Sequence, residues 1–267
     1  MSSSPLFPIL VFSDLDGTLI DHQHYRADAA KPALNALRAS GGGLIMASSK
    51  TGQEIAQIRD ALGWSDWPAI VENGAGLLPA HSPDTVPEKA DTAQYDTVRD
   101  VLENTPKGLR HSFRGFGNMT VSEVSQVTGL EQNAASLARQ RAFSEPGLWQ
   151  GNNDQRHEFL AYLSEHGVVA REGGRFLTLS FGQTKADRMT ALIAQFKPAH
   201  TAALGDAPND IEMLQAADVG VIVANPHRAP LPELEGENQG RILRTTLPGP
   251  QGWNLAVLEL LSKLEIA

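Results

Sequence analysis

The chain has 267 residues, enough for one large domain or two modest ones. Its 22 basic and 31 acidic residues leave a formal net charge of −9, which argues against nucleic acid and anionic membrane surfaces as partners. It has no cysteine, which excludes disulfides, thiolate metal sites and cysteine nucleophiles, and its apolar runs fall far short of the ~20 residues of a membrane span. With no basic patch before the first apolar run, we expect a cytoplasmic protein.

The first third of the chain alternates short apolar runs with helical patterns. Residues 9–12 form a run typical of a strand buried on both faces, and apolar residues at 30, 33, 34 and 37 mark one face of a helix. The pattern repeats with a run at 44–47, a helix face at 55, 58 and 62, and a run at 69–71. This alternation predicts an α/β fold with a doubly wound, Rossmann-like parallel sheet.

The pattern changes in the middle of the chain. Residues 120–124 and 175–181 alternate as strands do, whereas 133–141 has helical spacing. Strand and helix patterns then resume at 189–196, 201–204, 211–214, 219–223 and about 254–264. We therefore expect a core formed by residues 1–82 and 183–267, with an α+β cap of residues 83–182 inserted into it.

Asp14 and Asp16 follow the first predicted strand in the segment Asp14-Leu-Asp-Gly-Thr-Leu19. In open parallel sheets, ligands bind beyond the carboxyl ends of the strands. Two carboxylates one residue apart repel each other, and Mg²⁺, which prefers oxygen ligands, suits them. A carboxylate beside such an ion can attack phosphorus as a nucleophile. A simple turn with a helix N-cap is the alternative interpretation of this segment.

A second acidic segment, Gly205-Asp-Ala-Pro-Asn-Asp210, follows a later predicted strand. Asp206 would converge with Asp14 if the two strands are neighbours. Asn209 and Asp210 open the next helix, where they can cap it as well as serve a metal ion.

Ser48 ends the second predicted strand, and Lys185 precedes a predicted helix. A hydroxyl and an ammonium group can meet the negative oxygens of a phosphoryl group. Taken singly, Ser48 belongs to an ordinary helix-capping loop and Lys185 is a surface lysine. Their combination with the two acidic segments makes a phosphoryl site the better interpretation.

These four segments, in this order on a doubly wound pattern, resemble the motifs of the haloacid dehalogenase-like superfamily, and the inserted region resembles its type-two cap. Further segments are similar to the mannosyl-3-phosphoglycerate phosphatase family: Ala47-Ser-Ser-Lys-Thr51, Val71-Glu-Asn-Gly-Ala75, Ser144-Glu-Pro146, Gly173-Gly-Arg-Phe176 and Gly249-Pro-Gln-Gly-Trp253. The resemblance spans nearly the whole chain, although residues 84–120 match weakly.

The resemblance implies a role for each motif residue. Asp14 would be the nucleophile that forms an aspartyl-phosphate, and Asp16 would be the general acid and then the general base. The Mg²⁺ ligands would be Asp14, Asp16 and Asp206, supported by Asn209 or Asp210. Ser48 and Lys185 would hold the phosphoryl oxygens.

Substrate recognition is expected in the cap. Residues 84–181 contain eight arginines, and the planar fork of arginine suits a carboxylate. We expect Arg141 and Arg175 at the glycerate carboxylate and Ser144 and Glu145 at sugar hydroxyls, although each arginine could equally pair on the cap surface. The full set of expected substrate-binding residues is Ser48, Ser49, Asn73, Gly74, Arg141, Ser144, Glu145, Gly174, Arg175 and Lys185.

The implied activity is that of a Mg²⁺-dependent phosphomonoesterase that converts mannosyl-3-phosphoglycerate to mannosylglycerate and phosphate, a step of mannosylglycerate biosynthesis. The closest alternative is a phosphatase for glucosyl-3-phosphoglycerate or another small sugar phosphate. A phosphotransferase and a sugar-phosphate-binding protein without catalysis are further alternatives. The expected partner is a small sugar phosphate, and the sequence leaves monomer and dimer open.

Overall fold

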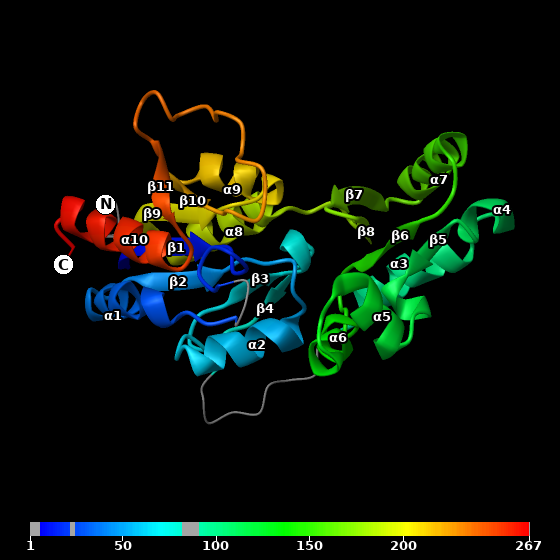
Figure 1. Ribbon diagram of the computed structural model, residues 1–267, viewed down its shortest axis with the longest axis horizontal. Coiled ribbons are helices and arrows are strands. Elements are labelled where there is room, and N and C mark those ends of the chain that lie inside the picture. Colours follow the sequence, from blue (N-terminus) through cyan, green and yellow to red (C-terminus); the bar gives the residue numbers. More distant parts are fainter. Residues whose placement is uncertain (1–5, 22–24, 82–90, 267) are drawn as a thin grey trace. The chain divides into compact units, whose positions relative to one another are not determined.

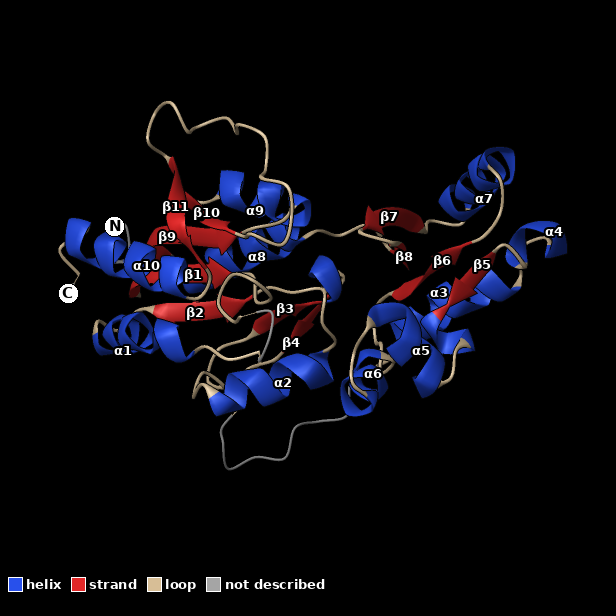
Figure 2. Cartoon of the chain, in the orientation of Figure 1, coloured by secondary structure: helices blue, strands red, loops and turns tan. Residues whose placement is uncertain are grey.

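The computed structural model describes residues 6–21, 25–81 and 91–266 (Figures 1 and 2). The chain divides into two compact units, and each unit is built from more than one segment of the sequence. The core unit comprises Met1–Ser48, Asp66–Ile70 and Lys185–Ala267, and the cap unit comprises Ser49–Ser65 and Val71–Thr184. The expected boundary between residues 82 and 83 lies outside the described residues, so the division into residues 1–82, 83–182 and 183–267 stays a prediction.

The core unit contains a five-stranded sheet in the order β11-β10-β9-β1-β2, with all pairs parallel. Its strands are β1 (Phe7–Ser13), β2 (Gly43–Met46), β9 (Pro198–Gly205), β10 (Val219–Ala224) and β11 (Ile242–Pro248). The apolar run of β1 is buried throughout, because helices cover both faces of a parallel sheet. The predicted strands at the centre of this sheet are confirmed. The sequence pattern predicts no strand at β11, an edge strand whose residues are mostly exposed.

The core helices cover both faces of this sheet. They are α1 (Lys31–Ala39), α8 (Lys185–Phe196), α9 (Ile211–Ala216) and α10 (Gln251–Lys263), with short 3₁₀ helices η1 (Asp28–Ala30) and η4 (Pro208–Asp210). The crossovers from β1 to β2 and from β9 to β10 run in opposite directions along the sheet. Since such crossovers are right-handed, α1 and α9 lie on opposite faces, and the predicted doubly wound topology is confirmed.

The cap unit contains a four-stranded antiparallel sheet in the order β5-β6-β8-β7. Its strands are β5 (Phe113–Gly115), β6 (Glu145–Trp149), β7 (Val169–Gly173) and β8 (Phe176–Ser180). The helices beside them in Figure 1 are α3 (Ala93–Glu103), α4 (Lys107–Arg110), α5 (Val121–Thr128), α6 (Gln132–Ala138) and α7 (Asn153–Glu165), with η3 (Phe116–Asn118) between β5 and α5. A buried cluster around Phe113 and Phe159 packs helices α3 and α7 against the sheet. This is the α+β composition expected of the inserted region.

The remaining elements belong to residues 52–78, a stretch of sequence divided between the two units. These are α2 (Gly52–Ala61), β3 (Ala69–Val71), the 3₁₀ helix η2 (Glu72–Gly74) and β4 (Gly76–Leu78). Thr51 begins α2 through a capping box with Glu54, as the capping-loop interpretation predicts. Among the described residues, no helix is long and apolar enough to cross a membrane.

The strand-like interpretation of residues 120–124 is wrong, because they open helix α5. Thr120 is the helix N-cap, and it forms a capping box with Glu123. Its side chain accepts a hydrogen bond from the Glu123 backbone, while the Glu123 carboxylate accepts one from the Thr120 backbone. The alternating pattern also fits helical spacing, since Val121 and Val124 lie three residues apart on one face.

Candidate active site

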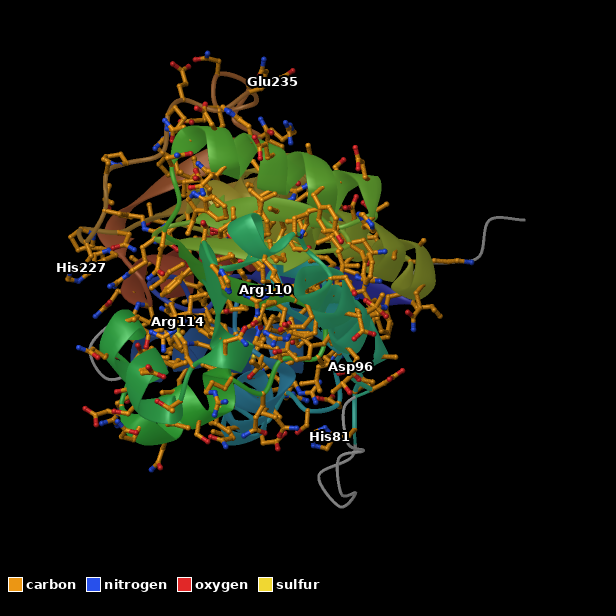
Figure 3. The ribbon with its side chains drawn as sticks, turned by 90° about the vertical axis from the view of Figure 1, so that its right-hand side faces the viewer. His81, Asp96, Arg110, Arg114, His227 and Glu235 are labelled. Atoms are coloured by element: carbon orange, nitrogen blue, oxygen red, sulfur yellow. The ribbon has the colours of Figure 1, made fainter. Side chains whose placement is uncertain are left out.

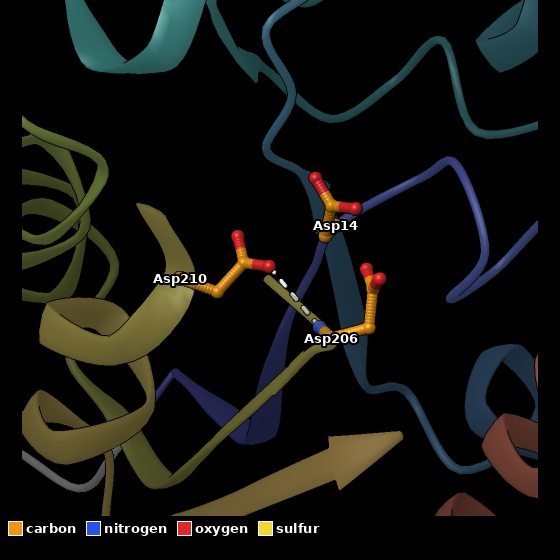
Figure 4. Close-up of side chains that lie close together, drawn as sticks. All are labelled: Asp14, Asp206 and Asp210. Carbon is orange, nitrogen blue, oxygen red and sulfur yellow. Dashed lines mark hydrogen bonds between the residues drawn. The ribbon is translucent and has the colours of Figure 1, made fainter. Parts of the chain in front are cut away.

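Asp14 and Asp206 meet because β1 and β9 are neighbouring strands. Ser13 pairs with Leu204 in the sheet, and the Asp14 backbone N–H donates to the Leu204 carbonyl oxygen at 2.9 Å. Asp210 joins them from η4 (Figure 4). One carboxylate oxygen from each of the three aspartates lies within 4.8 Å of the others, and all three residues are buried. The convergence of Asp14, Asp206 and Asp210 is therefore present in the structure.

Lys185 is the first residue of α8, and its side chain is buried among these carboxylates. Its Nζ donates to Asp14 Oδ1 and to Asp210 Oδ1, both at 2.7 Å. Burial alone would lower the pKa of Lys185, but the attraction of Asp14 and Asp210 outweighs it and holds the pKa above its ordinary value. The ammonium group is therefore charged at neutral pH.

Three buried carboxylates face the Lys185 ammonium and the exposed Arg228 guanidinium, which lies 3.4 Å from Asp206, so negative charge is in excess. Burial, followed by repulsion from Asp210, raises the pKa of Asp14 well above its ordinary value, although Lys185 pulls it down. A divalent cation would remove the imbalance. The donors are oxygens alone, as hard cations prefer, so the residues fit a divalent metal ion.

Backbone donors fix the orientation of Asp210. The N–H groups of Asp206 and Ala207 donate to Asp210 Oδ2 at 3.1 and 3.0 Å. Gly205 makes this arrangement possible, because a Cβ at that position would lie 2.5 Å from the Asp210 Cβ. The glycine of this motif is therefore explained by the close approach of an aspartate rather than by a turn.

Asp206 is held by three side chains that lie outside the predicted set of site residues. Thr18 Oγ1 donates to Asp206 Oδ1 at 3.0 Å, and Asn225 Nδ2 donates to Asp206 Oδ2 at 2.6 Å. Arg228 Nε lies 3.4 Å from the same Oδ2. Asn225 directly follows β10, so the strand-end rule that selected Asp14 and Asp206 could have found it. Asp206 and Arg228 also line an open cavity of about 380 Å³.

Asp16 lies in a tight turn after β1 and is half-buried. The Gly17 N–H donates to the Ile20 carbonyl at 2.8 Å, and Gly17 has a φ of 81°, which glycine adopts without strain. Gly249 packs against this turn so closely that a Cβ would lie 2.3 Å from the Thr18 carbonyl oxygen. The turn that carries Asp16 is thus braced by the segment before α10.

Ser48 lies two residues after the end of β2 and is buried. Its N–H donates to the Ile70 carbonyl oxygen at 3.0 Å. Ser49 and Asn209 are exposed. Asn73 and Gly74 lie in η2 with left-handed backbone, Asn73 half-buried and Gly74 buried. The proposed roles of these residues stay predictions.

The expected cap residues lie in two different environments. Arg141, Ser144 and Glu145 are buried. The Glu145 carboxylate accepts hydrogen bonds from Tyr95 Oη at 2.9 Å, Arg99 Nη1 at 2.8 Å and the Gly117 N–H at 2.9 Å. Gly174 and Arg175, in contrast, are exposed in the turn between β7 and β8, where the Arg175 guanidinium lies 5.8 Å from the centre of the Phe176 ring.

Most of the cap arginines are engaged by carboxylates of the cap unit itself. Figure 3 marks two of them, Arg110, which donates to Glu103 Oε1 at 2.8 Å, and Arg114, which pairs with Glu123. The others that form such pairs are Arg99, Arg141 and Arg156. This pairing narrows the choice of a substrate-binding arginine and favours the exposed Arg175 over the buried Arg141.

Known proteins resemble this chain over nearly its whole length. A glucosyl-3-phosphoglycerate/mannosyl-3-phosphoglycerate phosphatase from Persephonella marina is 29% identical, over 96% of this chain and 98% of its own. A solved phosphatase of the haloalkanoate superfamily from Bacteroides thetaiotaomicron is 18% identical with a TM-score of 0.67, covering 98% of this chain and 97% of its own. Sucrose-phosphatase from Synechocystis, solved with sucrose and phosphate, is 17% identical with a TM-score of 0.59, covering 97% and 98%. These solved structures share the fold.

The model of the haloacid dehalogenase-like hydrolase family matches residues 11–140 and 151–229. The matched range includes all four residues of the buried cluster, Asp14, Lys185, Asp206 and Asp210. The chain therefore belongs to the haloacid dehalogenase-like hydrolases and is an enzyme of that family.

Proposed function

We propose that the chain is a Mg²⁺-dependent phosphomonoesterase that works through an aspartyl-phosphate. The observation that carries this proposal is the group of three buried carboxylates around Lys185 at the carboxyl edge of the sheet. Such a group has a strong demand for a cation, and a carboxylate beside a bound cation can attack phosphorus as a nucleophile.

The proposed substrate is mannosyl-3-phosphoglycerate, which would yield mannosylglycerate and phosphate. The segments shared with that phosphatase family support it, and so does the name of the Persephonella marina relative, which covers the glucosyl and mannosyl compounds. Glucosyl-3-phosphoglycerate is the second candidate, because a single hydroxyl configuration separates the two sugars.

In the proposed reaction, an oxygen of Asp14 attacks phosphorus, and the bond from phosphorus to the ester oxygen of the substrate breaks. Asp16 gives a proton to the departing oxygen, and it then takes a proton from the water that hydrolyses the aspartyl-phosphate. The products are the free alcohol and inorganic phosphate, and Asp14 is regenerated.

The other buried groups of the site would manage the charge. Lys185, at 2.7 Å from Asp14, lowers the pKa of the nucleophile against the effect of burial and, with Ser48, would meet the phosphoryl oxygens. Asp14, Asp206 and Asp210 would hold the Mg²⁺ ion, which supplies positive charge for the phosphoryl group when bound.

The test is a phosphate-release assay over mannosyl- and glucosyl-3-phosphoglycerate, sucrose phosphate, trehalose phosphate and hexose phosphates. We expect the highest kcat/KM for mannosyl- or glucosyl-3-phosphoglycerate. Without a divalent metal ion we expect no phosphate release from any substrate. Release from hexose phosphates alone would refute the substrate assignment. A protein that binds these compounds but releases no phosphate would refute the reaction.

A further inference from the structure

A strained turn in the cap unit is tied to a buried ion pair. Glu72, Asn73 and Gly74 have successive φ values of 53°, 59° and 96°. Left-handed backbone is unfavourable for a residue such as glutamate, whereas asparagine and glycine tolerate it better, so the surroundings must hold Glu72 in place. Strain that the fold maintains in this way directs attention to what the turn does.

The Glu72 carboxylate fixes this turn through its hydrogen bonds. Its side chain is completely buried, and it accepts hydrogen bonds from the N–H groups of Ala142 and Phe143 at 2.8 and 3.2 Å and from Ser144 Oγ at 2.7 Å. Arg141 Nε lies 3.2 Å from Glu72 Oε2. These hydrogen bonds join the turn at Glu72 to the segment of residues 142–144, about 70 positions later in the sequence.

The same ion pair reaches the loop that follows Ser48. Arg141 Nη1 donates to the Ser49 carbonyl at 3.2 Å, and Arg141 Nη2 donates to Ser144 Oγ at 2.8 Å. The Glu72 N–H donates to the Lys50 carbonyl at 3.0 Å. Both partners of the ion pair therefore hold the backbone of residues 49–50, and Ser49 is joined directly to Ser48.

These contacts argue against Arg141 as a ligand of the substrate. Its Nη1 and Nη2 donate to Ser49 and Ser144, its Nε lies 3.2 Å from the Glu72 carboxylate, and the residue is only 8% exposed. Taking a substrate carboxylate would mean breaking contacts of a buried charge, and leaving Glu72 unpaired is expensive.

We propose that Glu72 and Arg141 are positioning residues, whose buried ion pair fixes the loop after Ser48 and thereby sets the affinity of the enzyme for the phosphoryl group. This inference rests on the proposed function, in which Ser48 holds a phosphoryl oxygen. In this proposal Arg141 does not bind the glycerate carboxylate of the substrate, and Arg175 binds it instead.

The test separates the two tasks by the chemistry of the ligand. Arg141→Met and Glu72→Gln are assayed with mannosyl-3-phosphoglycerate and with an aryl phosphate that has no carboxylate. Inorganic phosphate is measured as a competitive inhibitor and by calorimetry on the Mg²⁺-loaded protein. We expect kcat/KM to fall by a similar factor of about 10 to 100 for both substrates, with a matching loss of phosphate affinity.

Two comparisons keep the test decisive. Arg156→Met breaks an ion pair with Glu172 on the cap surface and should leave all these values unchanged. Ser144→Ala removes only the hydroxyl that hydrogen-bonds both Arg141 and Glu72. This milder variant should weaken phosphate binding severalfold, and it tests the inference if Arg141→Met does not fold. Unchanged phosphate affinity in a folded Arg141→Met variant, with activity lost on the phosphoglycerate alone, would overturn the inference. Likewise, variants that lose thermal stability but keep wild-type phosphate affinity would show a purely structural role.

A failure of the proposed function would look different. In that case the wild-type protein would release phosphate from neither substrate. The calorimetric comparison of wild type with Glu72→Gln and Ser144→Ala would still report whether the ion pair controls phosphate binding.

Discussion

The Lys185 ammonium lies 2.7 Å from Asp14 Oδ1, although 171 positions of sequence separate the two residues. Lys185 contacts Asp210 Oδ1 at the same distance, so one cation is shared between two buried carboxylates. Asp206 carries a third charge nearby. The charge balance of this site therefore depends on the lysine, and a bound divalent cation would offset the remaining negative charge.

Asp14→Asn should abolish turnover, because an amide oxygen is a far weaker nucleophile than a carboxylate. We expect kcat to fall by at least about three orders of magnitude with the fold retained. Phosphate release and circular dichroism measure the two parts of this prediction. Asp66→Asn, which weakens an exposed pair with Arg38, is the matched control and should remain active. Substantial turnover by Asp14→Asn would remove the nucleophile assignment.

Lys185→Met should destabilise the metal-free protein by about 3–5 kcal/mol, because it leaves buried carboxylates without their cation. Added Mg²⁺ should recover part of this loss, since it binds the folded state alone. Urea unfolding with and without Mg²⁺ measures both effects. The control is Lys263→Met, which removes an exposed pair with Glu259 and should change stability by less than about 0.5 kcal/mol. An equally small loss in Lys185→Met would contradict the charge argument.

Asn225→Ala should weaken metal binding about 10- to 100-fold, because Asn225 holds the Asp206 carboxylate that would coordinate the ion. Calorimetric titration with Mg²⁺ measures this directly and does not depend on turnover. Asn238 donates to the Glu233 carboxylate on an exposed loop, so Asn238→Ala makes the same change away from the site. Identical Mg²⁺ affinities for the two variants would show that Asn225 has no part in the metal site.

Arg175→Ala should lower kcat/KM for the phosphoglycerate about 10- to 100-fold, which is the value of one charge-assisted hydrogen bond to a carboxylate. An aryl phosphate should be hydrolysed at nearly the wild-type rate. Arg171, exposed on the adjoining strand β7, provides the control variant Arg171→Ala. If Arg175→Ala impairs both substrates equally, Arg175 does not read the glycerate carboxylate.

The sequence predicted the centre of the core unit well, for a physical reason. Strands such as β1 are buried on both faces and therefore appear as unbroken apolar runs, and the residues that follow them must lie at one edge of the sheet. That logic located Asp14 and Asp206. Asn225 obeys the same rule, but asparagine after a strand is also a common turn residue, so its position alone predicts no site.

The parts that escaped prediction depend on contacts that sequence spacing does not encode. Strand β11 lies at the sheet edge, and few of its residues are buried, so it shows no apolar run. The pairing of Glu72 with Arg141 joins residues about 70 positions apart, and neither belongs to a periodic pattern. Arginine in the cap suggested substrate binding by its chemistry, whereas packing decides which arginines are already occupied.

The pairing of β1 with β9 also bears on synthesis of the chain. Asp14 is made early, but Leu204, Asp206 and Asp210 come almost two hundred residues later. The nascent chain on the ribosome therefore has no metal-binding group of three carboxylates until most of its length has emerged. Pairing at such long range closes a large loop and is intrinsically slow, so the group of three carboxylates depends on a slow step of folding, the pairing of β1 with β9.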